Sequence, residues 1–356
     1  MSPPILDSPG PSTYENRVQA PPFLAACRRE PVPYTPVWLM RQAGRYMPEY
    51  RAVRQKLGFL ELCKRPDAAA EVTVTAVDVL GVDAAIIFAD ILLVLEPLGA
   101  HIEFAAGDGP VIHNPVRTAA DVDRLTPVAV GSLDYVGESV RRARAGLKVP
   151  LIGFAGAPFT LASYLIEGGS SRNFLRTKRF MLSDTGAWHA LMERLVVAVR
   201  DYLNMQIAAG AEAVQLFDSW VGALSPADYR TFVLPHVRTL VAGITPGVPV
   251  IHFGTDTAGI LECQRAAGGD VIGLDWRVDL DAGWARLGHD VAVQGNLDPT
   301  ALFAPLPELR RRVEAILGQA AGRPGHIFNL GHGILPETPV DHAKALVEMV
   351  HELSAR

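Results

Sequence analysis

The stretch PVWLMRQAGRYMPEYR (residues 36–51) holds the pattern from which the rest of the chain can be interpreted. Its apolar run, residues 37–40, stops abruptly at Arg41, and a second arginine follows at Arg45. A buried strand that ends in a basic loop brings guanidinium groups to a sheet edge, where their planar forks suit carboxylates and phosphates. A single arginine here is more simply a solvated group paired with a nearby acid such as Glu49. Two arginines directly after a buried-looking strand favour a binding site.

The same unit recurs along the chain, as an apolar run, a polar or glycine-containing stretch, and then a helical pattern. The runs are almost continuously apolar, as expected for strands that are buried on both faces. They lie at residues 37–40, 84–89, 150–154, 213–217, 248–253, 271–274, 291–294 and 326–330. Helical patterns lie at residues 65–80, 188–209, 227–241, 258–267, 306–317 and 338–353. Eight strands alternating with helices predict an α/β chain folded as a single (β/α)8 barrel. A doubly wound open sheet is the alternative, but no GxGxxG or GxxxxGK[ST] follows the first run.

Composition limits the class of function. The 356 residues are 49% hydrophobic and 20% charged, which allows a large core and excludes global disorder. The net charge of -5 argues against a nucleic-acid binder, so the basic loop fits a small anionic ligand better than a polymer. Three widely spaced cysteines predict neither a disulfide framework nor a zinc ribbon, and a reducing compartment, the cytoplasm, is the simplest interpretation.

The N-terminal stretch differs from the rest of the chain. Residues 1–17 are rich in proline and serine, lack the apolar core of a signal peptide, and are predicted to be a disordered extension. Residues 18–356 then form the barrel domain. No apolar run approaches the roughly 20 residues that a membrane span needs, so no membrane association is expected.

A barrel predicts where the site lies, because active sites sit at the C-terminal ends of the strands. Asp90 follows the second run and is either a loop cap or a site acid. Ser219, in LFDSW, lies outside any GxSxG elbow and is more simply a hydrogen-bonding group than a nucleophile. His332 lies between two glycines after the last run, which suits close approach of a ligand, although a structural loop histidine is the alternative.

Two further patterns need weighing. Tyr164, in the segment GFAGAPFTLASYLIEGGSSR (residues 153–172), lies on an apolar helical face, where a core tyrosine is the simpler interpretation. His252, His332 and Cys263 are conceivable metal ligands. Their spacing matches no compact metal motif, and the chain has no HExxH, so no metal is expected.

Several of these motifs resemble those of the uroporphyrinogen decarboxylase family. Residues 36–51 and the segment GFAGAPFTLASYLIEGGSS resemble its two long signatures. The shorter blocks AAIIFADIL, QLFDSW, VIGLDWRVDL, QGNLDP and FNLGHGILP occur in the family's order. The resemblance runs from about Phe23 to about His351.

The resemblance implies an enzyme that converts uroporphyrinogen III to coproporphyrinogen III in tetrapyrrole (heme) biosynthesis. It implies removal of carbon dioxide from four acetate side chains without a metal or organic cofactor, in a distorted (β/α)8 barrel that is usually a cytosolic homodimer. The family's substrate-binding residues correspond to Arg41, Arg45, Asp90, Tyr164, Ser219 and His332. Asp90 and Arg41 are the expected catalytic groups, while the identity of the proton donor stays open.

Two other functions remain to be weighed. Zinc-dependent methyltransferases of the same superfamily carry His-x-Cys after strand five and a cysteine after strand eight. The corresponding residues here are His252-Phe253-Gly254 and Gly331-His332-Gly333, so the thiolates of that soft zinc site are missing. A tetrapyrrole carrier or sensor is the non-enzymatic alternative, because fold alone does not determine function.

Overall fold

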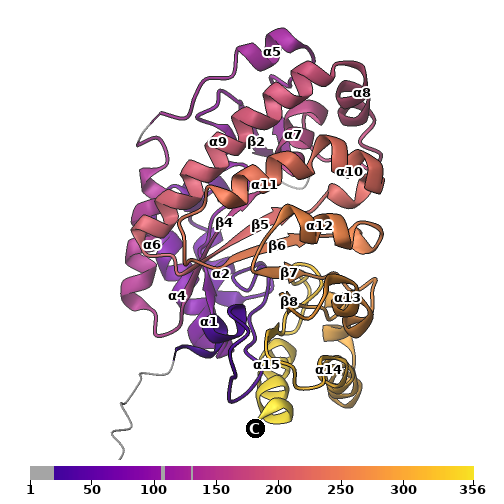
Figure 1. Cartoon of the computed structure of the whole chain (residues 1–356). Helices are drawn as coiled ribbons and strands as arrows, with labels where there is room; N and C mark the ends of the chain where they lie inside the picture. The colour runs from indigo at the N-terminus through magenta and orange to yellow at the C-terminus, as the bar shows by residue number, and fades with distance from the viewer. Residues whose placement is uncertain (1–19, 106–108, 130) are drawn as a thin grey trace, which may run out of the picture.

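The computed structural model describes residues 20–105, 109–129 and 131–356. Its centre is a curled, fully parallel sheet of seven strands surrounded by helices (Figure 1). The strands lie in the order β1 (Ala85–Ile86), β4 (Leu151–Gly156), β5 (Ala213–Asp218), β6 (Val250–Gly254), β7 (Val271–Gly273), β8 (Ala292–Gln294) and β9 (His326–Ile327). Each overlaps a run predicted from the sequence, and the predicted barrel class is confirmed. The predicted extension, residues 1–17, lies outside the described residues.

The first predicted strand, residues 37–40, is reduced to an isolated parallel bridge between Val37 and Phe328. It still joins the two edges of the sheet, because the Phe328 N–H donates to Pro36 O at 2.8 Å and the Asp83 N–H donates to Val37 O at 2.8 Å. Side chains satisfy part of its backbone. The Val37 N–H donates to the Asp83 carboxylate at 2.7 Å, and the Met40 N–H donates to the Asn329 amide oxygen at 3.1 Å. The prediction of a regular strand here is therefore wrong, whereas the closed circle of elements is correct.

The helices form the outer layer. They include α4 (Pro66–Leu80), α6 (Asp134–Gly146), α7 (Pro158–Glu167), α8 (Leu175–Ser183), α9 (Thr185–Ala209), α13 (Leu280–Leu287), α14 (Leu306–Ala320) and α15 (Val340–Ser354). The helix predicted at residues 227–241 is two helices, α10 (Pro226–Phe232) and α11 (Leu234–Ala242), because Pro235 has no N–H to continue the first. The start of the helix predicted at residues 258–267 is a 3₁₀ turn before α12 (Leu261–Ala267).

An antiparallel hairpin that the sequence pattern did not predict interrupts the barrel between β1 and β4. Its strands are β2 (Ile102–Ala105) and β3 (Gly109–Ile112), and Val111 forms a bridge to Gly169 just after α7. The neighbouring Val116 N–H donates to Leu165 O at 3.0 Å. The hairpin is therefore attached to the C-terminal end of α7, the helix that carries Tyr164.

Polar side chains cross the interior of the barrel. The Trp38 indole N–H donates to the Gln294 amide oxygen at 2.9 Å, and the Gln294 amide nitrogen donates to the Gln215 oxygen at 3.1 Å. All three side chains are buried. The chain links the first segment to β8 and β5, whose C-terminal ends carry candidate site residues. Among the described residues, no helix is long and apolar enough to span a bilayer.

Candidate active site

The Arg41 backbone has the left-handed conformation, with φ of 63°, which is uncommon outside glycine. The residues around it explain how this conformation is held. The Gln42 side chain accepts from the Leu39 N–H and donates to Ala84 O, both at 3.2 Å, while the Tyr46 hydroxyl donates to Gln42 O at 2.7 Å. These hydrogen bonds attach the loop to the barrel before and after the exposed Arg41. Strain of this kind is commonly found at functional sites.

The loop after β9 packs directly against Arg41. The Ile334 N–H donates to Met40 O at 2.9 Å, which joins this loop to the end of the first segment. A Cβ atom on Gly333 would lie 2.5 Å from Cδ, 2.8 Å from Cγ and 2.9 Å from Nε of Arg41. Gly333 therefore leaves the space in which the Arg41 side chain lies.

Asp90 lies just beyond β1 and is half-buried. One carboxylate oxygen, Oδ1, accepts from the Leu92 N–H at 2.8 Å, so the acid is held at one oxygen. Burial raises the pKa of Asp90 to about 6, and the Leu92 N–H and the positive charge of Arg41 partly oppose that rise. A carboxylate whose ionised form is only modestly favoured near neutral pH is typical of a functional group.

Tyr164 and His332 lie in the same electrostatic environment. Burial and the negative charge of Asp90 raise the pKa of Tyr164 to about 12, while Arg41 opposes this. Burial, followed by Arg41 and Arg277, lowers the pKa of His332 to about 4. At neutral pH, Tyr164 is a protonated hydrogen-bond donor and His332 is an uncharged imidazole. Arg41 acts on Asp90, Tyr164 and His332 alike, so the structure brings four predicted residues into one neighbourhood.

Ser219 precedes Trp220, whose ring contacts one member of this group. Trp220 stacks on Tyr164, with ring centroids 3.9 Å apart and an angle of 29° between the planes. The Thr255 hydroxyl donates to Ser219 O, which holds the turn after β5. Arg45 is also exposed, and among the described residues the hydrogen bond at this residue is to its backbone oxygen, from the Arg51 guanidinium at 2.9 Å. No contact brings the Arg45 guanidinium to the other five among the described residues.

The structure adds a third arginine that sequence reasoning missed. Arg277 lies two residues beyond Asp275, which follows β7, and the two form an ion pair at 2.8 Å. Arg277 also pairs with Asp256 at 2.8 Å and lies over the Trp276 ring, 4.2 Å from its centroid. Its effect on the pKa of His332 places it at the same rim. The sequence signal was the Asp-Trp-Arg sequence at the end of a predicted strand.

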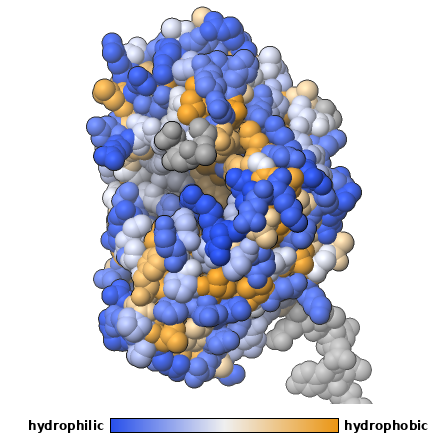
Figure 2. Space-filling view, turned by 180° about the vertical axis from the view of Figure 1, so that it is seen from behind, coloured by the Kyte–Doolittle hydropathy of each residue, from blue (hydrophilic) through white to orange (hydrophobic). Residues whose placement is uncertain are grey.

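One face of the molecule is hollowed. Figure 2 shows a hollow near the middle of that face, with apolar atoms at its depth and hydrophilic atoms beside it. This mixture is typical of small-molecule sites, which combine apolar area with a few oriented polar groups. Among residues 20–105, 109–129 and 131–356, no group of three or more His, Cys, Asp or Glu side chains is arranged to hold a metal.

Comparison with known proteins gives a consistent family match. The family model described as "Uroporphyrinogen decarboxylase (URO-D)" matches residues 19–353. A relative from Solibacter usitatus, named uroporphyrinogen decarboxylase, is 57% identical over 334 residues, which are 93% of this chain and 96% of the relative. A relative of the same name from Sorangium cellulosum is 59% identical over 335 residues, again 93% and 96%.

Solved structures add a likeness of fold. A methyltransferase from Methanosarcina mazei matches with a TM-score of 0.75 and 20% identity, over 93% of this chain and 97% of the methyltransferase. A B12-independent methionine synthase from Shewanella sp. matches with a TM-score of 0.56 and 11% identity, over 81% and 87%. At these identities the likeness concerns the barrel alone.

Proposed function

The chain belongs to the uroporphyrinogen decarboxylase family, and on that basis we propose that it is a carboxy-lyase that converts uroporphyrinogen III to coproporphyrinogen III in tetrapyrrole biosynthesis. The observation that carries the proposal is the common neighbourhood of Arg41, Asp90, Tyr164 and His332 at one end of the barrel. This neighbourhood offers one acid (Asp90), one permanently charged cation (Arg41), and two uncharged hydrogen-bonding groups (Tyr164 and His332). An octacarboxylate built around four pyrrole N–H groups needs these features for binding.

The substrate provides its own electron sink in this mechanism. Protonation of a pyrrole carbon next to the acetate-bearing position makes the ring cationic. The bond between the acetate methylene and its carboxylate then breaks, the electron pair moves into the ring, and carbon dioxide leaves. Protonation of the methylene carbon and loss of the added ring proton restore the pyrrole with a methyl group. Each of the four steps therefore consumes one proton and one carboxylate.

Asp90 has the central role in this proposal. Its ionised carboxylate accepts hydrogen bonds from pyrrole N–H groups and stabilises the positive charge that develops on the ring. Leu92 already holds Oδ1, so the carboxylate is oriented before the substrate binds. Such preorganised electrostatics is usually the largest single contribution to catalysis. The raised pKa shows that the fold holds this charge at some cost until a cationic partner forms.

The arginines and the uncharged groups bind the substrate's periphery. Arg41 provides a two-pronged donor for a reacting or neighbouring carboxylate, and Arg45, on the exposed part of the loop, receives a more peripheral one. Arginine itself is an awkward proton donor because its pKa is very high, so a water or an acid that Arg41 positions fits that step better. Tyr164, Ser219 and His332 are positioning and binding groups.

We expect kcat/KM to rise with pH between about 5 and 7, with a midpoint near the Asp90 pKa of about 6. The active form needs the carboxylate ionised, and below the pKa the rate should fall about tenfold per pH unit. The His332 pKa of about 4 keeps that side chain neutral throughout this range. A pH series of initial rates measures the effect. Residual activity of Asp90→Asn should lack this limb, and a limb that persists in the variant belongs to another group.

Two glycines of one loop offer a matched test of how Arg41 is held. In Gly333→Ala the new Cβ meets the flexible Arg41 side chain, so we expect KM to rise about tenfold, with little change in melting temperature. In Gly331→Ala the Cβ would lie 2.5 Å from the Trp276 backbone nitrogen. That variant should melt about 5 °C lower. Steady-state kinetics and thermal melts distinguish the two, and an unchanged KM for Gly333→Ala would contradict the role of Arg41.

Anaerobic incubation with uroporphyrinogen III is the decisive assay of function. We expect the tetracarboxylate product and undiminished activity after exhaustive chelation. Tight binding without loss of carbon dioxide would support the carrier alternative. Activity that disappears on chelation and returns with zinc would support the methyltransferase alternative.

We further propose that the enzyme is a cytoplasmic homodimer and that residues 18–356 form one catalytic domain behind an N-terminal extension. The exposed leucines of α8 support dimerisation, because Leu175 and Leu182 are 71% and 60% exposed. Sedimentation equilibrium should give about twice the 38.3 kDa chain mass. The double variant Leu175→Asp/Leu182→Asp should shift the protein toward the monomer. A wild-type monomer at micromolar concentration would contradict this expectation.

A further inference from the structure

Three polar side chains between the sheet and its outer helices have unsatisfied hydrogen-bonding atoms. They are Asp218, the last residue of β5, His252 in β6, and Tyr229 in α10, and none of them is accessible to solvent. Asp218 Oδ2, His252 Nε2 and the Tyr229 hydroxyl have no hydrogen-bond partner among the described residues. Buried polar atoms are rarely left in this state, because an unsatisfied group loses its hydrogen bonds to water without gaining others.

The alternation of the strands brings the Asp218 and His252 side chains together. Leu216 pairs with His252 in the parallel register, so the two side chains lie on one face, and Asp218 is on that face two residues further along β5. Gln215, by contrast, belongs to the chain of polar side chains inside the barrel. Asp218 and His252 therefore face the helical layer that contains Tyr229. Burial and the charge of Asp218 raise the pKa of the Tyr229 phenol, which places the phenol within electrostatic reach of the carboxylate.

The hydrogen-bonding roles of these atoms indicate what lies between them. His252 Nδ1 contacts Gly268 O at 3.3 Å, and a carbonyl can only accept, so Nδ1 carries a proton. His252 Nε2 and Asp218 Oδ2 are 3.8 Å apart, which is too long for a direct hydrogen bond. One water molecule between them can hydrogen-bond to both atoms, and it can accept from the Tyr229 hydroxyl.

Asp218 also connects this buried site to the rim. Its other oxygen, Oδ1, accepts from the Thr160 hydroxyl at 3.0 Å. Thr160 Oγ1 in turn accepts from the backbone N–H of Trp220 at 3.3 Å. Thr160 and Tyr164 are four residues apart on α7, and Trp220 stacks on Tyr164. Asp218 is therefore linked both to the turn after β5, which carries Trp220, and to α7, which carries Tyr164. These are the two rings that stack.

From these contacts we infer that Asp218, His252 and Tyr229 hold one internal water molecule, and that Asp218 is thereby a positioning residue for the Ser219–Trp220 turn and Tyr164. The water site stands on the buried contacts alone, whereas the effect of Asp218 on catalysis rests on the proposed decarboxylase function.

A high-resolution crystal structure tests the water directly. We expect one ordered water within hydrogen-bond distance, about 2.6–3.2 Å, of at least two of the three atoms. A direct contact between Asp218 Oδ2 and His252 Nε2, or an empty space between the three side chains, would overturn the inference.

The variant Tyr229→Phe provides a test by the sign of its effect on stability. If the hydroxyl donates to a water, its removal should lower the melting temperature by about 2 °C. If the hydroxyl is truly unpartnered, its removal should leave the melting temperature unchanged or raise it, which would contradict the water site. Tyr46→Phe is the matched reference, because the Tyr46 hydroxyl has a defined acceptor, Gln42 O at 2.7 Å.

The variant Asp218→Asn tests positioning, because it keeps side-chain volume and an oxygen for Thr160 but removes the charge and one acceptor. We expect KM to rise about tenfold while kcat stays within about threefold, and the emission of Trp220 to shift. Trp220→Phe identifies the Trp220 component of the fluorescence. Unchanged KM together with unchanged Trp220 emission would overturn the positioning role. If the wild-type enzyme itself failed to turn over, the function would be wrong, but the water density, the Tyr229→Phe melt and the Trp220 emission would still test this inference.

Discussion

Replacing Asp90 by asparagine should lower kcat by about 10³-fold and, at the same time, make the protein more stable at neutral pH. The loss of rate follows from removing the only charge proposed to stabilise the cationic ring. Asparagine keeps an oxygen that can accept from the Leu92 N–H, so the loop after β1 should keep its conformation. Single-turnover measurements of carbon dioxide release provide the rate without interference from product release.

The expected gain in stability follows from the direction of the pKa shift. Burial raises the Asp90 pKa from 3.8 in the unfolded chain to about 6 in the fold. Between these values the folded state binds more protons than the unfolded state, so stability falls as pH rises and remains lower above pH 6. The shift corresponds to up to about 3 kcal/mol, and partial exposure reduces the expected gain in Asp90→Asn to about 1–2 kcal/mol. Urea unfolding at pH 7 and pH 4 measures it, and most of the gain should be lost at pH 4, close to the unfolded pKa.

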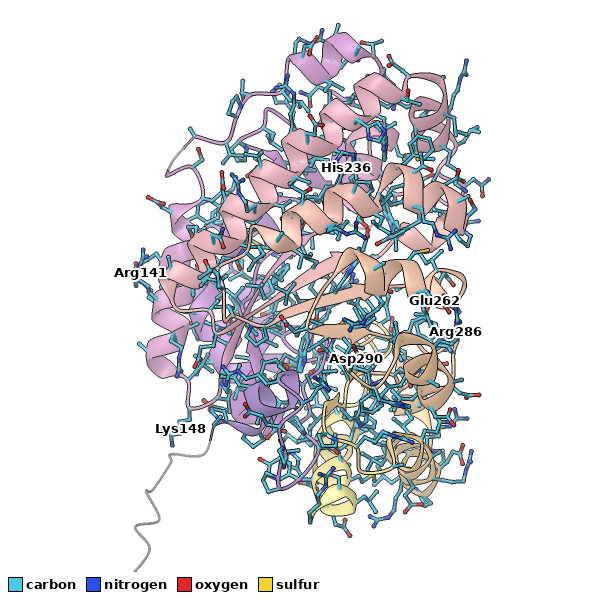
Figure 3. All side chains as sticks on the ribbon, viewed as in Figure 1. Arg141, Lys148, His236, Glu262, Arg286 and Asp290 are labelled. Atoms are coloured by element: carbon cyan, nitrogen blue, oxygen red, sulfur yellow. The ribbon has the colours of Figure 1, made fainter. Side chains whose placement is uncertain are left out.

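Asp290→Asn is the control for this variant. Asp290 is an exposed acid paired with Arg265 at 3.0 Å, just before β8 and thus at the opposite end of the strands from the rim (Figure 3). Its replacement should leave turnover unchanged. Near-wild-type turnover of Asp90→Asn would contradict the catalytic role, and a loss of stability at pH 7 would contradict the pKa argument.

Replacing Arg41 by lysine should lower kcat/KM by about 10²-fold, although the positive charge remains. The guanidinium offers two parallel donors to a carboxylate, and an ammonium cannot reproduce that geometry. Because charge is retained, the pH limb assigned to Asp90 should stay near pH 6 in the variant. If kcat/KM falls while the midpoint of its pH dependence stays near 6, the loss is due to the geometry of the hydrogen bonds and not to a change in charge.

Arg286→Lys is the matched control for this second variant. Arg286 forms a two-pronged pair with Glu262, with both contacts at 2.8 Å, between α13 and α12 on the outer layer (Figure 3). The same chemical change there should leave kcat/KM within about twofold of wild type. Unchanged kinetics in Arg41→Lys would show that a point charge is sufficient and that two-pronged recognition at this position is wrong.

The order of the elements could be predicted from the chain, but the form of the first strand could not. Seven runs became parallel strands because each is apolar enough to be buried on both faces. The run after Pro36 is equally apolar, yet its backbone bonds to the side chains of Asp83 and Asn329, which are distant in sequence. An apolar pattern reports burial, and it carries no information about which atoms satisfy the backbone.

The site was predictable to a similar degree. The rim positions of Arg41, Asp90 and His332 follow from the rule that strands of a barrel end on one side. The positive charge of Arg41 influences the pKa values of Asp90, Tyr164 and His332. That influence depends on the conformation of the loop and on the space beside Gly333, which sequence alone does not show. Arg277 was missed because it lies three residues beyond the end of the predicted run at residues 271–274. The buried group around Asp218 was missed because its members come from three separate elements.

The proposed mechanism depends on Asp90 binding the pyrrole N–H groups while arginines bind the carboxylates. A crystal structure of the complex with coproporphyrinogen III, prepared without oxygen, tests this directly. We predict at least two pyrrole nitrogens within about 2.7–3.2 Å of the Asp90 carboxylate, with a side-chain carboxylate of the ligand on Arg41. A macrocycle bound at the rim with its nitrogens away from Asp90, or held elsewhere on the barrel, would contradict this mechanism.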